Sequence, residues 1–218
     1  MNFLGQGNKG GLISSAVRRR TGEYPPARLL LPGGLEPRVL TTLYSFCAQS
    51  GCPDGDGPSA GVIQATNGNL YGTTAFGGAN AFGTIFELTM SGTLTTRYSF
   101  CGAAETSGGC KGTSNSANNG YDPVVGLVQA TDGDFYGTTF GGGANVSACP
   151  PNTGGGTVFK ITPRGKLTTL YSFCSQSGGA DGYDPVSTLV QARNGDFYGT
   201  TRWGGDHNDG TVFRLSAH

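Results

Sequence analysis

The stretch GLVQATDGDFYGTTFGGGANVSACPPNTGGGTVFKITPRGKLTTLYSFC, residues 126–174, decides the fold, because it is one full copy of a unit that recurs along the chain. An earlier copy, GVIQATNGNLYGTTAFGGANAFGTIFELTMSGTLTTRYSFC, occupies residues 61–101, and a shortened copy runs over residues 188–218. A fragment at residues 40–47, LTTLYSFC, matches only the end of the unit. Repetition at this scale predicts a fold assembled from neighbouring copies of one supersecondary unit.

Each unit predicts four short antiparallel strands, because aromatic and β-branched residues alternate with turn-forming pairs. In the copy at 126–174 the strands are expected at Gly126–Ala130, Phe135–Phe140, Thr157–Thr162 and Lys166–Phe173. Asp132-Gly133 predicts a two-residue hairpin turn with positive backbone angles. No window has a sustained helical period, so no helix is expected inside the repeats.

A repeated four-stranded antiparallel unit is typical of β-propeller blades. The sequence therefore predicts an all-β fold with about three propeller-type blades. The repeats begin on a fourth strand at residues 40–47 and finish on a third strand at Thr211–Leu215. Three blades are too few for an ordinary closed ring. We therefore expect a partial or open propeller, a fragment of a longer product, or half of a six-bladed homodimer joined through its open blade edges.

Recurring aromatic residues mark equivalent positions in the units. Tyr71, Tyr136 and Tyr198 each begin a Tyr-Gly-Thr-Thr motif and are expected on second strands. Third strands are expected to carry equivalent, mostly buried phenylalanines at Phe86, Phe159 and Phe213. We interpret these aromatic residues as packing between blades. The paired threonines are interpreted as strand positions whose hydroxyls bond neighbouring backbone.

Residues 1–39 lie outside the repeats, so the predicted division is a leader at 1–39 and a repeat domain at 40–218. Arg18-Arg19-Arg20 follows rather than precedes an apolar stretch, which makes this leader a poor secretory signal. We expect the leader to be disordered; a basic arm that binds a surface is the alternative.

Composition and charge exclude several kinds of partner. The 14 basic and 14 acidic residues cancel, which argues against nucleic acid, since phosphate binding needs a basic surface. A hydrophobic fraction of 36% argues against a disordered chain. No apolar run of about 18 residues exists, so no membrane span is expected.

Two loops vary in length while the predicted strands do not. One joins the second and third strands, at residues 75–82, 141–156 and 202–209. The other joins the fourth strand to the next unit, at residues 48–60, 102–125 and 175–187. In an up-and-down sheet both loops emerge on the same face. Variable loops on one face of a fixed scaffold usually form the binding side.

Residues suited to catalysis are scarce. The two histidines, His207 and His218, have no metal-ligand spacing, and no Gly-x-Ser-x-Gly motif occurs. The sequence therefore predicts no catalytic residue, no cofactor site and no enzyme activity.

Calcium is the one metal that the loops suggest, because paired carboxylates in Gly-rich loops supply hard oxygen ligands. The candidate ligands are Asp54, Asp56, Asp122, Asp181 and Asp184. Asp, Gly and Pro are also ordinary turn formers, so turn structure without a metal is the alternative.

Six cysteines predict three disulfides and an oxidising compartment. If the variable loops share a face, the pairs are Cys47–Cys52, Cys101–Cys110 and Cys149–Cys174. Six free thiols are the alternative; a metal site is disfavoured, since no Cys-x-x-Cys occurs.

The units resemble the GloVer tandem-repeat family of bacterial proteins. The resemblance rests on Asn/Asp-Gly-x-Leu/Phe-Tyr-Gly-Thr-Thr, then Gly-Gly, then Gly-Thr-Val/Ile-Phe, then Leu-Thr-Thr-x-Tyr-Ser-Phe, and covers about Leu40–His218. It implies a secreted or surface-anchored repeat protein, and it transfers no catalytic residue.

The function expected from the sequence is that of a non-enzymatic extracellular or cell-surface module. It would bind an unknown protein or glycan through its loop face. A purely structural spacer in a larger surface protein is the first alternative. A propeller-type lyase or hydrolase is the second, and it would need acid–base residues that converge at the centre of the blades.

Overall fold

The computed structural model describes residues 39–101, 119–145 and 154–216. The chain divides into two compact units, Met1–Thr41 and Thr42–His218. Of the first unit only residues 39–41 are described, so the predicted leader lies almost wholly outside the described residues. All the described strands lie in the second unit.

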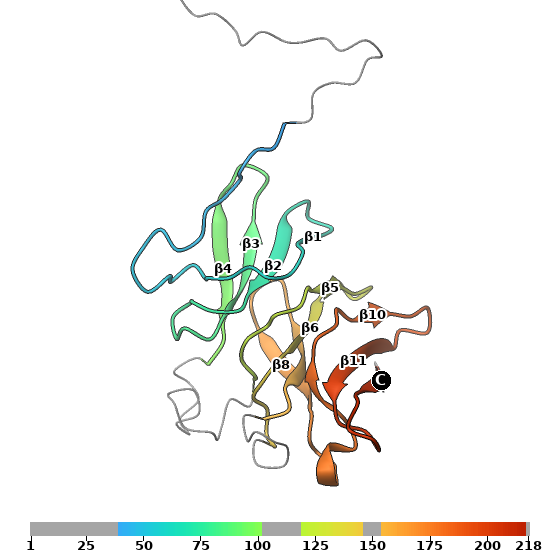
Figure 1. The fold of residues 1–218 in the computed structure, drawn as a ribbon. Helices are drawn as coiled ribbons and strands as arrows, with labels where there is room; N and C mark the ends of the chain where they lie inside the picture. The colour runs from blue at the N-terminus through green and yellow to red at the C-terminus, as the bar shows by residue number, and fades with distance from the viewer. Residues whose placement is uncertain (1–38, 102–118, 146–153, 217–218) are drawn as a thin grey trace, which may run out of the picture. The chain divides into compact units, whose positions relative to one another are not determined.

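Three four-stranded antiparallel sheets make up the second unit, as predicted (Figure 1). Sheet 1 contains β1 (Ile63–Gln64), β2 (Leu70–Thr74), β3 (Thr84–Leu88) and β4 (Leu94–Ser99). Sheet 2 contains β5 (Val128–Gln129), β6 (Phe135–Thr139), β7 (Thr157–Ile161) and β8 (Leu167–Ser172). Sheet 3 contains β9 (Tyr183–Pro185), β10 (Val190–Gln191), β11 (Phe197–Trp203) and β12 (Thr211–Leu215). Sheets 1 and 2 follow the chain order, each strand pairing with the next, which is the arrangement of a propeller blade.

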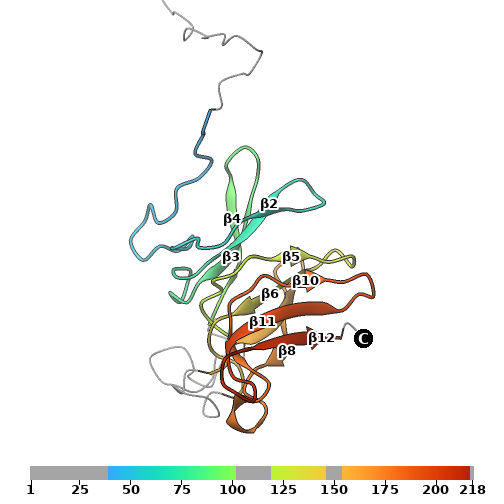
Figure 2. The ribbon, with the colours of Figure 1, turned by 45° about the vertical axis from the view of Figure 1, so that its right-hand side comes forward.

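Helix is limited, among the described residues, to one 3-10 turn, η1 (Ser177–Gly179), which lies between the repeats. The expectation that the repeats contain no helix is therefore confirmed for their described parts. Sheet 3 differs from the other two, since β11 and β12 run side by side but no fourth strand follows β12 in the described chain (Figure 2).

One turn prediction is wrong in type. The chain between β5 and β6 does not form a two-residue hairpin at Asp132-Gly133: the N–H of Ala130 donates to the carbonyl of Asp134, and the N–H of Gly133 donates back to Ala130. Only Gly133 has a positive φ, at 85°. A longer loop with one left-handed glycine satisfies the backbone here, and the Asp132 side chain accepts from the N–H of Asp134.

The sequence did not predict β9. This strand pairs with the end of β11, Tyr183 opposite Trp203, and so makes β11 longer than its counterparts. Single bridges take the same place in the other sheets, Asp56 with Phe76 and Tyr121 with Gly141. The Asp-Pro loops are therefore backbone partners of the second strands.

Residues 40–47 were predicted as a fourth strand, and they are not one in the structure. A strand is defined by its ladder partners, and no described strand pairs with this segment. Its packing, described below, nevertheless follows that of β4 and β8.

The glycine of each Tyr-Gly-Thr-Thr motif is required by an aromatic ring on the neighbouring strand. Gly72 lies opposite Phe86, and a Cβ on Gly72 would stand 2.6 Å from Cζ of that ring. The same relation recurs for Gly137 with Phe159 and for Gly199 with Phe213. Because glycine has no Cβ, the phenylalanine ring can lie flat against the neighbouring strand.

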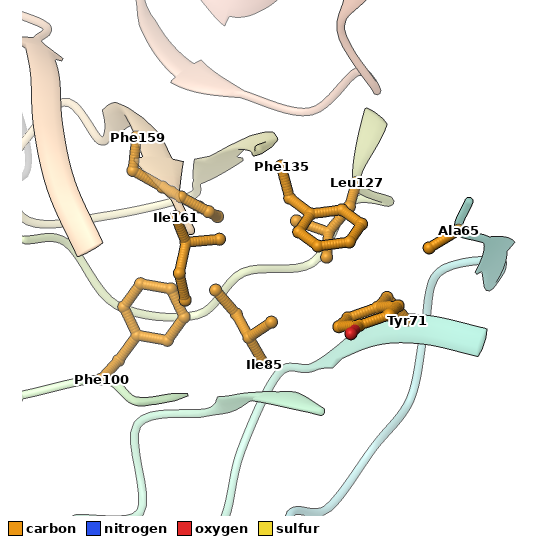
Figure 3. Close-up of a cluster of buried hydrophobic side chains, with 8 residues drawn as sticks. All are labelled: Ala65, Tyr71, Ile85, Phe100, Leu127, Phe135, Phe159 and Ile161. Carbon is orange, nitrogen blue, oxygen red and sulfur yellow. The ribbon is translucent and has the colours of Figure 1, made fainter. Parts of the chain in front are cut away.

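Successive sheets pack through stacked aromatic rings (Figure 3). Tyr71 of β2 stacks on Phe135 of β6 with 4.3 Å between ring centroids, and the core around them includes Ile85 and Leu127. Tyr136 stacks in the same way on Phe197, at 4.1 Å. The predicted packing of aromatic residues between blades is therefore confirmed.

The equivalent aromatic residues are buried, as predicted, in sheets 1 and 2, but they are less buried in sheet 3. Tyr71, Tyr136, Phe86 and Phe159 are buried. Tyr198 is only partly buried because no described sheet packs against the far side of sheet 3. Phe213 faces sheet 2, where it contacts Phe173, and it is only partly buried because no described strand covers the outer edge of β12.

Candidate functional site

The two variable loops of each repeat meet at the same end of their sheet, as expected. In sheet 1 the N–H of Gly78 donates to the carbonyl of Cys52 over 2.9 Å. In sheet 3 the N–H of Gly205 donates to the carbonyl of Gly179 over 3.1 Å. We call this surface the loop face; its described loops are residues 48–60, 75–83, 119–125, 141–145, 154–156, 175–187 and 202–210.

A pair of buried threonine hydroxyls anchors each loop pair to its sheet. Thr139 Oγ1 and Thr157 Oγ1 lie 2.9 Å apart, and the Thr139 hydroxyl also accepts from the N–H of Thr157 and donates to the carbonyl of Gly141. The same pair recurs as Thr74 with Thr84 and as Thr201 with Thr211. The interpretation made from the sequence is therefore confirmed for the second threonine of each Tyr-Gly-Thr-Thr motif, since Thr74, Thr139 and Thr201 all donate to a backbone carbonyl.

A glycine of the preceding loop lies directly over each threonine pair. Gly55 has a φ of 113°, and a Cβ there would stand 2.5 Å from Thr74 Oγ1 and 2.9 Å from Thr84 Oγ1. Gly120 and Gly182 repeat this arrangement over Thr139 and Thr201. The glycine that recurs in these three loops thus allows a close backbone approach that a side chain would prevent.

Two of the calcium candidates are acceptors for a tyrosine and for backbone donors. Asp181 accepts from the Tyr171 hydroxyl at 2.8 Å and from the N–H groups of Ser175 and Gln176 at 2.9 and 3.2 Å. Burial alone raises the pKa of this carboxyl, but these donors outweigh it and the pKa is lowered. Asp54 accepts from the Tyr44 hydroxyl and the N–H of Cys47 in the same manner.

Two other candidates, Asp122 and Asp184, are carboxyls at the junctions between sheets. The N–H of Asp122 donates to the carbonyl of Phe82 in sheet 1, and the N–H of Asp184 donates to the carbonyl of Gly155 in sheet 2. Both residues have a left-handed backbone, with φ of 53° and 54°. Burial raises the pKa of each carboxyl to about 6. The two aspartates occupy equivalent positions in the second and third loops, and the first loop has Gly57 at this position.

The structure does not gather the calcium candidates into one site. Asp56 uses its backbone to pair with Phe76, and its side chain is exposed. The part of the chain that the structure describes contains no group of three or more His, Cys, Asp or Glu side chains that could hold a metal ion. Calcium binding by these loops therefore stays a prediction.

Aromatic side chains recur on the loop face at the ends of the second strands. Phe76 is 53% exposed and Trp203 is 37% exposed, although both are large apolar residues. Sheet 2 has Gly141 at the equivalent position, and the ring of Tyr121 from the preceding loop covers it, with Cε2 2.6 Å from where a Cβ would stand. Each repeat thus presents an aromatic ring at this place.

A hollow of about 510 Å³ opens on the loop face of sheet 3, directly after Trp203 in the chain. Its lining contains Asp206, His207 and Asp209. His207 lies in this hollow, whereas His218 falls outside the described residues. Carboxylates and an imidazole suit hydrogen bonding with a polar ligand. Trp203 does not line this hollow; its ring carries the Arg202 guanidinium, 5.3 Å from the ring centroid.

The disulfide prediction is confirmed for its first pair, Cys47–Cys52. Cys101 and Cys174 are also disulfide-bonded. Their predicted partners, Cys110 and Cys149, lie outside the described residues, so these two pairings stay predictions. All three cysteines that end a Tyr-Ser-Phe-Cys motif have a left-handed backbone, with φ of 61–62°.

Sequence reasoning missed the glutamines that join the first strands. Gln129 of β5 accepts from the N–H of Thr66 in sheet 1 at 2.8 Å, and its amide donates to the carbonyl of Gly133. Gln191 of β10 accepts from the N–H of Thr131 at 3.1 Å. The signal was present, since every unit contains a Gln-Ala pair at this point.

These repeated sheets, with loops anchored at one end, define a tandem-repeat protein made of propeller-type blades. Residues 111–218 match the Gloeobacter/Verrucomicrobia repeat, which confirms the predicted resemblance of the repeats to that family. No curated protein matches the sequence. No helix in the described residues is long and apolar enough to cross a membrane.

Solved structures resemble the chain only distantly. One is a protein provisionally assigned as a gluconolactonase, with 16% identity and a TM-score of 0.43. Another is the virginiamycin B lyase from Staphylococcus aureus, with 14% identity and a TM-score of 0.37. Each match covers 72% of this chain but only 45% and 41% of the other, so the chain spans less than half the length of either. The fold assignment rests on the sheets themselves.

Proposed function

We propose that the chain is a non-enzymatic binding module of an extracellular or cell-surface protein, and that it binds a glycan on its loop face. The observations that support this proposal best are the partly exposed ring of Trp203, at the end of β11, and the hollow lined by Asp206, His207 and Asp209, which follow it closely in the chain. Sugars are commonly bound by an aromatic face, which packs against their C–H groups, together with acceptors and donors for their hydroxyls.

The proposed location rests on the disulfides. Cys47, Cys52, Cys101 and Cys174 are all disulfide-bonded, and structural disulfides form and persist in oxidising compartments. A binding role is favoured over catalysis because many polar side chains already form hydrogen bonds within the protein. The Thr pairs, Asp54 and Asp181 form hydrogen bonds within the repeat array, and the pKa is raised at two equivalent carboxyls, Asp122 and Asp184, rather than at a single one.

Binding to an array of immobilised bacterial and plant polysaccharides tests this function. We expect the full chain to bind at least one class of polysaccharide and Trp203→Ala to weaken that binding at least ~tenfold, the loss of one good ring contact. The matched control is Val190→Ala, which removes another exposed apolar side chain, 63% exposed, from β10 rather than from the loop face. Equal losses in the two variants, or no binding to any polysaccharide, would contradict the proposal.

A further inference from the structure

The segment Thr42–Cys47 packs on sheet 1 as the fourth strand of one sheet packs on the next. Phe46 contacts Phe86 of β3 edge to face, with 5.1 Å between ring centroids. The corresponding contacts are Phe100 with Phe159 at 5.6 Å and Phe173 with Phe213 at 5.0 Å. In each case the phenylalanine comes from the end of a Leu-Thr-Thr-x-Tyr-Ser-Phe run and the partner from a third strand.

Backbone contacts agree with these ring contacts. A Cβ on Gly92, in the turn of sheet 1, would stand 2.7 Å from the carbonyl oxygen of Leu43. Gly165 in sheet 2 has the same relation to the carbonyl oxygen of Arg97, the residue of β4 equivalent to Leu43. The segment therefore takes the position of a fourth strand in a further blade, and the described residues supply no other strand of that blade.

Among the described residues, sheet 3 has no strand in the position that β4 and β8 take in sheets 1 and 2. In sheets 1 and 2 the third strand pairs with a fourth, whereas no described strand pairs with the outer edge of β12. A groove of about 380 Å³ runs along this edge, lined by Val158, Tyr171, Phe173, Ala180, Asp181 and residues 211–215. Val212 of β12 is 79% exposed, while the equivalent Ile85 and Val158 are 1% exposed.

Sheet 1 likewise has no complete described sheet packed against its outer side. Val62, just before β1, is 49% exposed, while the equivalent Leu127 and Leu189 are 1% and 2% exposed. The two ends of the repeat array thus expose the residue types that its internal junctions bury. Exposed strand edges and apolar patches of this kind recruit a partner.

The groove along β12 fits a sequence that the chain itself contains. Residues 40–47, LTTLYSFC, are identical to residues 167–174, which include β8 and fill this position in sheet 2. Within one chain this segment already rests on sheet 1, through Phe46 and Leu43. Sheet 2 packs against both sheet 1 and sheet 3, which places the segment and the groove at opposite ends of the array.

We propose that the groove along β12 binds the Leu40–Phe46 segment of a second copy of this chain, which pairs with β12 as β4 pairs with β3 in sheet 1. The register follows from sheet 1, where Ile85 lies opposite Tyr98, Phe86 opposite Thr96 and Glu87 opposite Thr95. It places Tyr44 of the second copy opposite Val212, Thr42 opposite Phe213 and Thr41 opposite Arg214. The contact is head to tail, and two copies that exchange their segments form a closed dimer.

Cysteine cross-linking between two separately prepared variants tests this register. Thr41→Cys and Arg214→Cys replace exposed residues that the proposal places opposite each other. We expect the mixed variants to form a disulfide-linked heterodimer, identified by peptide mass spectrometry, at least ~tenfold more than a mixture of Thr41→Cys with Arg164→Cys. Arg164 is an equally exposed arginine, but it lies in the turn before β8.

The oligomeric state provides an independent readout. Sedimentation of the unmodified chain at micromolar concentration is expected to show a dimer, and Thr42→Pro is expected to raise its dissociation constant at least ~tenfold over Thr42→Ala, because proline cannot donate to a strand ladder. A monomer at these concentrations would overturn the proposal. A cross-link that forms only within a single chain carrying both cysteines would do so as well, since it would assign the groove to the chain's own segment.

Discussion

The ring of Phe159 lies over Gly137, with Cζ 2.7 Å from the place where a Cβ on Gly137 would stand. This contact is the clearest link between the repeated motif and the packing of a sheet, because any larger residue at 137 must displace a ring that is completely buried. Leu127 crowds the same position, 3.0 Å away, so the ring cannot easily move aside.

We therefore expect Gly137→Ala to lower the free energy of unfolding by about 1–3 kcal/mol, the usual cost of an extra methyl group in a filled core. Urea unfolding followed by fluorescence measures the change. Gly61→Ala is the control, because no heavy atom lies within 4 Å of its Cβ position and its φ is not left-handed. That variant should stay within about 0.5 kcal/mol of the parent. A loss of equal size in both variants would contradict the packing argument.

The paired hydroxyls give a second expectation, with a control on the adjacent residue. Thr139→Val keeps the side-chain shape but removes the acceptor of the buried Thr157 N–H, so it should destabilise the chain by about 1–3 kcal/mol. Thr138 Oγ1 is also buried, and it has no hydrogen-bond partner among the described residues. Thr138→Val should therefore be neutral or stabilising in the same urea titration. The reverse ranking of the two variants would refute this assignment of the hydroxyls.

Much of the fold follows from the sequence, because the repeat shows which residues are equivalent. Strand positions within the three units and the aromatic packing could be predicted, since each depends on a motif that occurs three times. The first disulfide could be predicted from the short spacing of Cys47 and Cys52 in one loop. The pairing of β9 with β11 and the role of Gln129 could not, because both depend on how one unit contacts another in space. The calcium candidates show the same limit: the loops contain the carboxylates, but only the structure shows Asp181 bonded to Tyr171.

The two disulfides that extend beyond the described residues form the third expectation. Peptide mass spectrometry of the non-reduced chain should find Cys101 linked to Cys110 and Cys149 linked to Cys174, because all four described cysteines are oxidised. The second of these pairs closes a loop of about 25 residues and should contribute about 3 kcal/mol by chain entropy. Cys149→Ser should lose stability of that order under oxidising conditions only. Peptides that link Cys101 to Cys149 would show the pairing to be wrong.

The junction carboxyl Asp184 leads to a pH-dependent expectation. Burial raises its pKa from 3.8 to about 6 in the folded chain, so the folded state holds a proton that the unfolded state has lost. This group therefore favours folding most below about pH 4, and its contribution is lost as the pH rises to about 6. Asparagine carries no charge at any of these pH values, so Asp184→Asn avoids the loss of stability that the buried carboxylate causes as the pH rises. Asparagine also suits the left-handed backbone at this position, where φ is 54°.

We expect Asp184→Asn to leave stability nearly unchanged at pH 4 and to raise it by about 1–2 kcal/mol at pH 7. Asp181→Asn makes the same change in charge, but the pKa of Asp181 is lowered by its hydrogen-bond donors, so it stabilises the fold above its ordinary pKa of 3.8 and loses this effect in acid. That control should destabilise the chain at pH 7 and less so as the pH falls below 3.8. Thermal unfolding of both variants between pH 3 and pH 8 measures the two trends. If Asp184→Asn destabilised the chain at pH 7, the carboxylate of Asp184 would have to be stabilised in the fold, contrary to the burial that raises its pKa.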